Sequence, residues 1–195
     1  GVISLLFRDI AAHKPGTLSS VGLGTFVDPR FGGGKMNAIT MEDRVALMTI
    51  GSEEYLFYKS FPIHVALIRG TTADPDGNIS MEREALTLEV LAIATAVHNS
   101  GGVVIVQVER LAERGNLNPR NVKVPGVLVD CVVVAPPEHH WQTFATPYNP
   151  AFSGEIRVPL QSIEPMTMGE RMLLARRAAL EILHNSVANL GIGMP

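Results

Sequence analysis

The chain has 195 residues, of which 46% are hydrophobic and 18% charged, as expected of a globular protein with a sizeable core. Its formal net charge is -3, whereas nucleic-acid binding needs a broad basic surface, so we expect no nucleic-acid partner. No run of about 18 apolar residues occurs, so we expect no membrane span. The high apolar share favours a large buried sheet or an oligomer interface, and we expect a homo-oligomer.

The compartment is inferred from the N-terminal segment and from cysteine usage. The segment GVISLLFRDI carries Arg8 and Asp9 within its apolar run and has no basic leader, which is not typical of a signal peptide. Cys131 is the one cysteine, and its setting in VLVDCVVVAP predicts a buried thiol that packs as a small hydrophobe. Because no disulfide can form within the chain, we expect a reducing, cytoplasmic location.

The N-terminal third begins with a predicted helix. Residues 1–14 are expected to be helical, because apolar side chains recur at the spacing i, i+3, i+4, i+7. Pro15 and Gly16 favour a helix end at that point. Residues 18–23 then read as a short strand that leads into a glycine-rich loop.

The central part predicts strands that alternate with a helix. Residues 55–61 and 64–70 read as strands, and residues 84–98 as a helix that is apolar on most faces. Residues 102–109 and 127–135 are nearly continuous β-branched runs, which are typical of central parallel strands. Strand, helix and strand in this order favour an α/β protein with an open, mostly parallel sheet and helices on both faces.

The texture of the sequence changes after residue 135. Six prolines lie between Pro136 and Pro165, and we interpret residues 136–169 as a Pro-rich linker on the surface. A helix is expected from residue 170, followed near residues 185–195 by a short strand and a glycine turn. Because no helix follows to cover that last strand, we expect the chain to be a fragment of a longer protein.

The loop GLGTFVDPRFGGGKMN, residues 22–37, holds five glycines. It matches neither the P-loop pattern nor the G-x-G-x-x-G dinucleotide fingerprint. Two interpretations stay open. The loop is either a long turn whose glycines take positive φ angles, or a backbone wall that a ligand approaches at the carboxyl end of a strand. Lys35 is likewise left between a contact to a phosphate and a solvated loop tip.

Other polar residues carry weaker signals. His139 and His140 are adjacent and cannot easily converge on one metal, so we expect them in a solvated loop and predict no metal site. Glu82 and Glu84 are interpreted as surface acids. No nucleophile elbow occurs. The residues by themselves therefore name no catalyst.

Several longer motifs occur in a fixed order along nearly the whole chain. They are GLGTFVDPR, EYLFYKSFPIHVALIRGTTADPDGNI, AVHNSGGVVIVQVE, VPGVLVDCVVV, RRAALEI and NLGIGMP. Together they resemble the family I coenzyme A transferases, with the greatest likeness to the single-chain acetate/propionate and ketoacid branch. The resemblance implies two similar α/β halves with an active site between them. It places residues 1–135 in the later part of the first half, 136–169 in the linker and 170–195 at the beginning of the second half.

The implied reaction is ping-pong transfer of CoA from a short-chain acyl-CoA to a carboxylate of the acetate, propionate or acetoacetate type. It passes through a glutamyl-CoA thioester. The family's nucleophilic glutamate falls after Pro195 and a glutamine at the reaction centre falls before Gly1, so this stretch alone is expected to be inactive. CoA is a substrate here, and the resemblance implies no metal or redox cofactor.

The resemblance assigns substrate binding to two glycine-containing edges, one in each half. The first would bring bare backbone close to the acyl group or the pantetheine arm, with backbone N–H groups and the Thr25 hydroxyl as donors. The second would form the matching edge of the other half. The substrate-binding residues implied in this way are Gly22, Gly24, Thr25, Phe26, Gly191 and Gly193.

Two other interpretations remain. The same general fold serves as a ligand-sensing domain in regulators, which predicts an attached DNA-binding segment, and this sequence contains no such segment. Alternatively, the chain is a non-catalytic ligand-binding or partner subunit that contributes one wall of a site. The presence of linker and second-half residues on one chain favours the fused enzyme.

Overall fold

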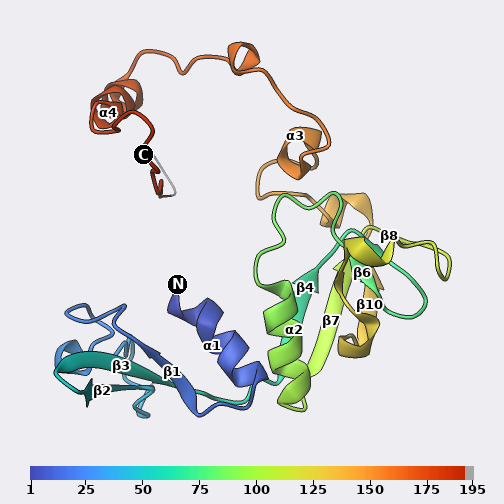
Figure 1. Ribbon diagram of the computed structural model, residues 1–195. Helices are drawn as coiled ribbons and strands as arrows, with labels where there is room; N and C mark the ends of the chain where they lie inside the picture. Colours follow the sequence, from blue (N-terminus) through green and yellow to red (C-terminus); the bar gives the residue numbers. More distant parts are fainter. Residues whose placement is uncertain (192–195) are drawn as a thin grey trace. The chain divides into compact units, whose positions relative to one another are not determined.

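A computed structural model describes residues 1–191 of the chain (Figure 1). The chain divides into two compact units, of which the first is Gly1–Ile156 and the second begins at Arg157. All the described strands lie in the first unit, where they alternate with helices, so the α/β class is confirmed. Within residues 1–191, no helix combines the length and the apolar content needed to cross a membrane.

The centre of the first unit is a three-stranded parallel sheet (Figure 1). Its strands, in spatial order, are β10 (Cys131–Val134), β7 (Val103–Val108) and β4 (Val65–Arg69). Helix α2 (Val90–Asn99) lies in the connection from β4 to β7, which gives the β-α-β arrangement that the alternating pattern predicts. The three strands predicted at 64–70, 102–109 and 127–135 are therefore confirmed, and they are parallel to one another.

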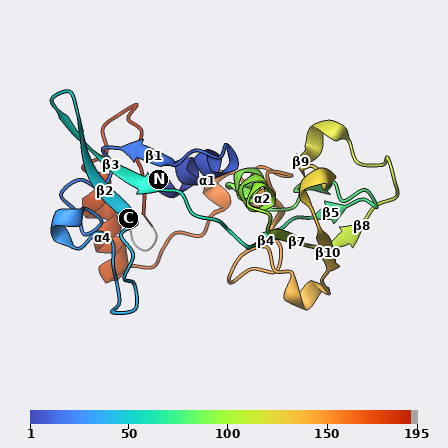
Figure 2. The same ribbon diagram turned by 90° about the horizontal axis from the view of Figure 1, so that it is seen from below.

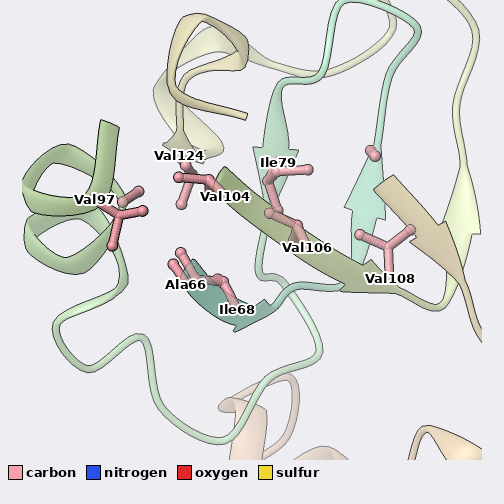
Figure 3. Close-up of a cluster of buried hydrophobic side chains, with 10 residues drawn as sticks. Ala66, Ile68, Ile79, Val97, Val104, Val106, Val108 and Val124 are labelled. Atoms are coloured by element: carbon pink, nitrogen blue, oxygen red, sulfur yellow. The ribbon is translucent and has the colours of Figure 1, made fainter. Parts of the chain in front are cut away.

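Alternate side chains of the parallel strands point toward α2 and form the main core. Figure 3 shows Ala66 and Ile68 of β4 with Val104 and Val106 of β7, on the side from which Val97 of α2 approaches. The complete cluster is Ala66, Ile68, Ala73, Ile79, Ala94, Val97, Val104, Val106, Val108 and Val124. Small and β-branched side chains let the helix lie close to the strands.

The opposite face of this sheet is apolar and exposed within the first unit, whereas the sequence led us to expect helices on both faces. Leu67 is 80% exposed, and Val65 and Val103 are exposed too. Cys131 stands in register with Ile105, which pairs with Leu67, so it belongs to this face. The expectation of a buried thiol was therefore wrong, because successive side chains of a strand point to opposite faces and Cys131 lies on the uncovered one.

A second, mixed sheet adjoins the ends of the parallel strands. Its strands, in spatial order, are β8 (Arg110–Leu111), β5 (Thr72–Ala73), β6 (Ile79–Ser80) and β9 (Val122–Val124). Short 3₁₀ turns at Pro119–Asn121 and Gly126–Leu128 flank β9. The reversal between β5 and β6 is the one predicted from TTADPDGN: Asp74 Oδ1 accepts the backbone N–H groups of Asp76 at 3.0 Å and Asn78 at 2.9 Å.

A third sheet is antiparallel and precedes the parallel one in the chain. Its strands, in spatial order, are β1 (Gly16–Ser19), β3 (Glu53–Lys59) and β2 (Val45–Ile50). The strand expected at 18–23 is thus shorter, begins earlier and pairs with an antiparallel neighbour. Helix α1 (Val2–Ala11), predicted from its apolar spacing, packs against α2 (Figure 1, Figure 2). Leu6 and Ile10 form that contact with Ala96.

Helix α2 is shorter than its apolar pattern predicts. The sequence favours a helix over 84–98, but α2 begins at Val90. Leu88 adopts a left-handed backbone with φ of 47°, which a helix cannot contain. Residues before it form a loop instead, in which the Arg83 backbone N–H donates to the Thr71 hydroxyl at 3.0 Å. A tertiary contact has therefore overridden local helical preference.

The C-terminal part contains only short helical elements. These are the 3₁₀ turn Pro137–His139, α3 (Pro150–Ser153), the 3₁₀ turn Leu160–Ser162 and α4 (Glu170–Ala179). The helix predicted from residue 170 is confirmed. The strand expected after it does not form in residues 185–191, and residues 192–195 lie outside the described part of the chain. No side chain of residues 157–191 is buried.

Candidate functional site

The glycine loop lies between β1 and β2 and includes the 3₁₀ turn Pro29–Phe31. Gly22 and Gly24 have φ angles of 101° and 71°, so the loop is a turn of the kind that favours glycine. It follows a strand of the antiparallel sheet. Gly22–Thr25 therefore lie beyond the carboxyl end of a strand, as the ligand-wall interpretation requires, but this strand, β1, is antiparallel to its neighbour.

Asp28 organises the loop from inside. Its side chain is completely buried, and its Oδ2 accepts the backbone N–H of Gly24 at 2.9 Å. Its Oδ1 accepts the backbone N–H of Arg30 at 3.0 Å, as an N-cap residue does. Hydrogen bonds from the Arg30 guanidinium, and then the Gly24 N–H, hold the pKa of the Asp28 carboxyl far below its ordinary value.

Sequence reasoning missed Asp28, although a local signal was present. Asp followed by Pro is the pattern of an N-cap residue before a first-turn proline, here Pro29. The bond to Gly24 could not have been predicted in this way, because it depends on how the loop between the two residues folds back on itself.

Three of the predicted hydrogen-bond donors of the loop are engaged within the loop itself. The backbone N–H of Thr25 donates to Gly22 O at 3.1 Å, and the Thr25 hydroxyl donates to the same oxygen at 2.7 Å. The N–H of Gly24 is taken by Asp28. In this geometry those three groups donate within the loop, and the prediction that the loop donates to a ligand stays a prediction. What the loop presents outward is bare backbone.

Gly22 and Gly24 are required for different reasons. A Cβ on Gly22 would lie 2.5 Å from Tyr58 Oη and 2.6 Å from Val27 Cγ2, so packing inside the loop excludes it. A Cβ on Gly24 would meet no atom within 4 Å, so Gly24 faces open space. Phe26 beside it is 60% exposed. Gly24 and Phe26 thus form an exposed edge, which we call the glycine edge, whereas Gly22 is a structural glycine.

The residues predicted for the second edge are placed only in part. Gly191 is exposed and belongs to the second unit. Gly193 lies outside the described residues. The pairing of these two glycines with the glycine edge stays a prediction.

Lys35 is tied to its own loop. Its Nζ lies 2.5 Å from Asp43 Oδ1 and donates to Met41 O at 3.3 Å. Hydrogen bonding to Lys35 lowers the pKa of Asp43. Because Asp43 is well exposed, this ion pair contributes little to stability and leaves both interpretations of Lys35 open.

A second group of polar side chains lies beyond the carboxyl end of β4. Glu84, whose side chain is only 6% exposed, accepts from Arg69 Nε at 2.6 Å. His140 is also buried, and its Nε2 lies 3.5 Å from Glu84 Oε1 and has no hydrogen-bond partner among residues 1–191. Its Nδ1 lies 3.0 Å from Gln107 Nε2. The interpretation of Glu84 and His140 as solvated residues was wrong. Residues that follow Pro136 cross this end of the sheet and cover them, and Arg69 donates to the carbonyl oxygen of His140 at 3.0 Å.

These side chains line a cavity of about 140 Å³ whose charges balance. Arg83 pairs with Glu109 at 2.5 Å and stacks over the ring of Tyr148 at 3.7 Å from its centroid. Gln142 donates to the Arg83 carbonyl oxygen at 2.8 Å. Each arginine already has a carboxylate partner, so the cavity is not an anion site. In the described part of the chain, no group of three or more His, Cys, Asp or Glu residues is arranged to hold a metal ion.

The first unit is thus an α/β unit with an exposed glycine edge, and comparison with known proteins identifies its family. The sequence profile of the coenzyme A transferase family matches residues 6–135. The chain therefore belongs to the coenzyme A transferase family.

Individual relatives match along the whole chain. The chain is 54% identical to the caffeate CoA-transferase of Acetobacterium woodii and 41% identical to the acetate CoA-transferase YdiF of Escherichia coli O157:H7. The crystal structure of the YdiF apoenzyme superimposes on 99% of the chain with a TM-score of 0.88. In each case the chain spans little more than a third of the relative, 37% of the first and 36% of the second.

Proposed function

We propose that the full-length protein transfers CoA between an acyl-CoA and a carboxylate. The observation that carries this proposal is the 54% identity, over the whole chain, to an enzyme named for that reaction. The superposition on YdiF supports it, because it covers 99% of the chain with a TM-score of 0.88. Because the chain spans about a third of these relatives, the activity is proposed for the full-length protein.

The proposed chemistry is ping-pong transfer through a glutamate that lies outside this chain. Its carboxylate attacks the thioester carbonyl and expels the CoA thiolate, which leaves an acyl-glutamyl anhydride. The thiolate then attacks the glutamyl carbonyl, which releases the acyl carboxylate and forms a glutamyl-CoA thioester. The acceptor carboxylate reverses both steps. CoA is a substrate throughout, and the proposal includes no metal and no redox cofactor.

The contribution of this chain is the glycine edge. Gly24 carries no side chain and has open space on its exposed side, so an acyl group or a pantetheine arm can approach its backbone closely. Phe26 is exposed next to it and is proposed to close over the bound group. Gly22, Thr25 and the hydroxyl bond to Gly22 O keep the turn in shape. The edge therefore acts by its shape, and developing charge is stabilised by donors elsewhere.

For the acyl group we propose short-chain acids of the acetate, propionate or acetoacetate type. The E. coli relative is named for acetate, whereas the Acetobacterium relative is named for caffeate, an aromatic acid. Caffeate therefore belongs in any test of acceptor preference. A homo-oligomeric, cytoplasmic enzyme remains our proposal for its state in the cell.

The test is an intact-mass measurement on the full-length protein after incubation with acetyl-CoA and no acceptor. We expect a covalent adduct with the mass of CoA less water, which disappears when propionate or acetate is added. The 195-residue chain alone is the control and is expected to stay unmodified. Absence of an adduct with acetyl-, propionyl- and caffeoyl-CoA alike would overturn the proposal.

A non-catalytic partner subunit is the second candidate. The observation in its favour is that the chain is 25% identical, over 133 residues, to the alpha subunit of E. coli acetate CoA-transferase. The mass measurement separates the two. An adduct on the polypeptide that carries residues 1–195 supports the fused enzyme, whereas an adduct only on a co-purified second chain supports the partner subunit.

A further inference from the structure

Asp28 is a buried charge whose surroundings are built to keep it ionised. It accepts five hydrogen bonds, two from the backbone of Gly24 and Arg30 and three from the Arg30 guanidinium. The Arg30 Nη2 to Asp28 Oδ2 distance is 2.7 Å, which is typical of a charge-assisted bond. A carboxylate without exposed surface is tolerated only when it is paired and hydrogen-bonded in this way.

The same cluster ties the glycine loop to the antiparallel sheet. The other end of the Arg30 guanidinium lies 3.1 Å from Glu54 on strand β3. Four residues further along that strand, Tyr58 Oη donates to Val21 O at 2.6 Å, on the N-terminal side of Gly22. Strand β3 thus holds the loop from both sides. We call these contacts the clamp: the pair of Asp28 with Arg30 and the contacts of the loop with Glu54 and Tyr58. Because Glu54 is half exposed, the inner pair of Asp28 and Arg30 is the stronger part of the clamp.

What the clamp holds is the glycine edge. The N–H of Gly24 points into the loop toward Asp28, so the opposite side of the residue faces outward. Gly24 has no side chain for its neighbours to pack against, and a Cβ added to it would meet no atom within 4 Å. A hydrogen bond to its backbone is the contact that remains, and a buried carboxylate makes that bond strong.

We propose that Asp28 is a positioning residue for CoA transfer, which holds the glycine edge at the place where substrate passes. This inference rests on the proposed function. Displacement of a positioning contact by about 1 Å can lower a rate by about a hundredfold. Asp28 itself is buried and does not touch substrate, so it acts through the backbone of Gly24.

The first measurement compares Asp28→Asn with the wild-type full-length protein. Asparagine has the same size but no charge, and cannot accept from Gly24 and the Arg30 guanidinium with both oxygens. We expect kcat to fall at least tenfold while the KM for acyl-CoA changes less than threefold, because an interaction that matters in the transition state is lost. Glu42→Gln is the matched control. Glu42 also pairs with an arginine, Arg44, at 2.7 Å, but lies on the surface, and we expect activity within twofold of wild type.

The second measurement is amide hydrogen exchange at Gly24 and Arg30, which does not depend on the proposed function. We expect exchange at both amides to be faster in Asp28→Asn and unchanged in Glu42→Gln. Unchanged exchange at Gly24 would overturn the proposal whatever the activity. Faster exchange with an unchanged kcat would also overturn it, because Asp28 would then order the loop without serving the reaction.

Failure of the proposed function is separable from failure of this inference. Absence of a CoA adduct in the wild type overturns the function, whereas an active wild type with an equally active Asp28→Asn overturns only the positioning role. If Asp28→Asn melts below the assay temperature, Arg30→Lys carries the test. It keeps a cation but loses the fork that joins Asp28 to Glu54, and we expect kcat to fall at least threefold. An unchanged kcat in Arg30→Lys would then overturn the proposal.

Discussion

The parallel sheet and the glycine loop of the first unit are held in place by opposite means. The parallel strands, α2 and the mixed sheet beside them share a cluster of ten buried apolar residues, with Val104 and Val106 of the central strand fully enclosed. The loop beside the antiparallel sheet is held instead by a buried carboxylate, Asp28, which binds backbone N–H groups. Apolar packing holds side chains, so it can build a scaffold. Bare backbone has to be held by hydrogen bonds.

The two candidate sites, the cavity at the carboxyl end of β4 and the glycine edge, also differ in how open they are. The carboxyl end of β4 is where ligands usually bind in open α/β sheets, yet here Arg69 and Glu84 are paired and covered by the segment after Pro136. The glycine edge lies at an antiparallel sheet and is open. In this chain the exposed backbone is therefore the better candidate for substrate contact than the charged cavity.

The largest expected effect is on the parallel scaffold, and two adjacent positions on β4 reveal it. Ile68 is 5% exposed and faces α2, whereas Leu67 faces the open side. We expect Ile68→Asp to lower the free energy of unfolding by about 4 kcal/mol or more, because a charge is buried without a partner. Leu67→Asp is expected to cost about 1 kcal/mol. Urea unfolding followed by circular dichroism measures both, and equal effects would contradict the assigned faces.

A smaller effect distinguishes the two glycines of the loop. We expect Gly22→Ala to cost about 3 kcal/mol, because a Cβ there meets Tyr58 and Val27 and φ is positive. Gly24→Ala has only the left-handed backbone to oppose it and is expected to cost about 1 kcal/mol. Thermal unfolding checks the order.

Gly24, whose substitution costs less stability, is expected to matter for activity. In the full-length protein we expect Gly24→Val to lower kcat/KM for acyl-CoA at least tenfold, because the new side chain fills the space that substrate is proposed to approach. An unchanged rate in Gly24→Val would remove the argument for close approach at the glycine edge.

The smallest expected effect is the pH dependence of the stability that Asp28 contributes. The pKa of Asp28 is lowered from an ordinary value of 3.8, so its contribution to stability is present above that value and is lost as the pH falls toward the folded-state pKa. We expect the stability difference between wild type and Asp28→Asn to be constant from pH 7 to about pH 5 and to shrink below about pH 4. Urea unfolding at a series of pH values measures it. A difference that stays constant through pH 3 would show that Asp28 acts through shape alone.

Local pattern and the order of motifs predicted much of this molecule. The apolar spacing of α1 and the β-branched runs of β4, β7 and β10 identified those elements, since each depends on neighbours a few residues away. The motif series led to the transferase family, which the match over residues 6–135 confirms. Strand β2 was missed, because its residues Val45–Ile50 form a strand only by pairing with β3.

The candidate site was predictable only in outline. The sequence pointed to Gly22, Gly24, Thr25 and Phe26, but it could not tell a structural glycine from an exposed one. That distinction depends on Tyr58, which lies 36 residues from Gly22 in the chain and contacts it across the sheet. The burial of Glu84 and His140 was equally hidden, since it results from a segment that returns from another part of the chain.

By itself, the sequence determined the class of fold, the family and the loop where substrate contact is proposed, because periodicity and motif order are properties of the chain. Only the tertiary structure decided which strands share a sheet, which face of each strand is covered, and that Asp28 takes the N–H of Gly24. Those features arise between residues that the chain brings together on folding, and the free energy of such contacts depends on geometry that no local pattern contains.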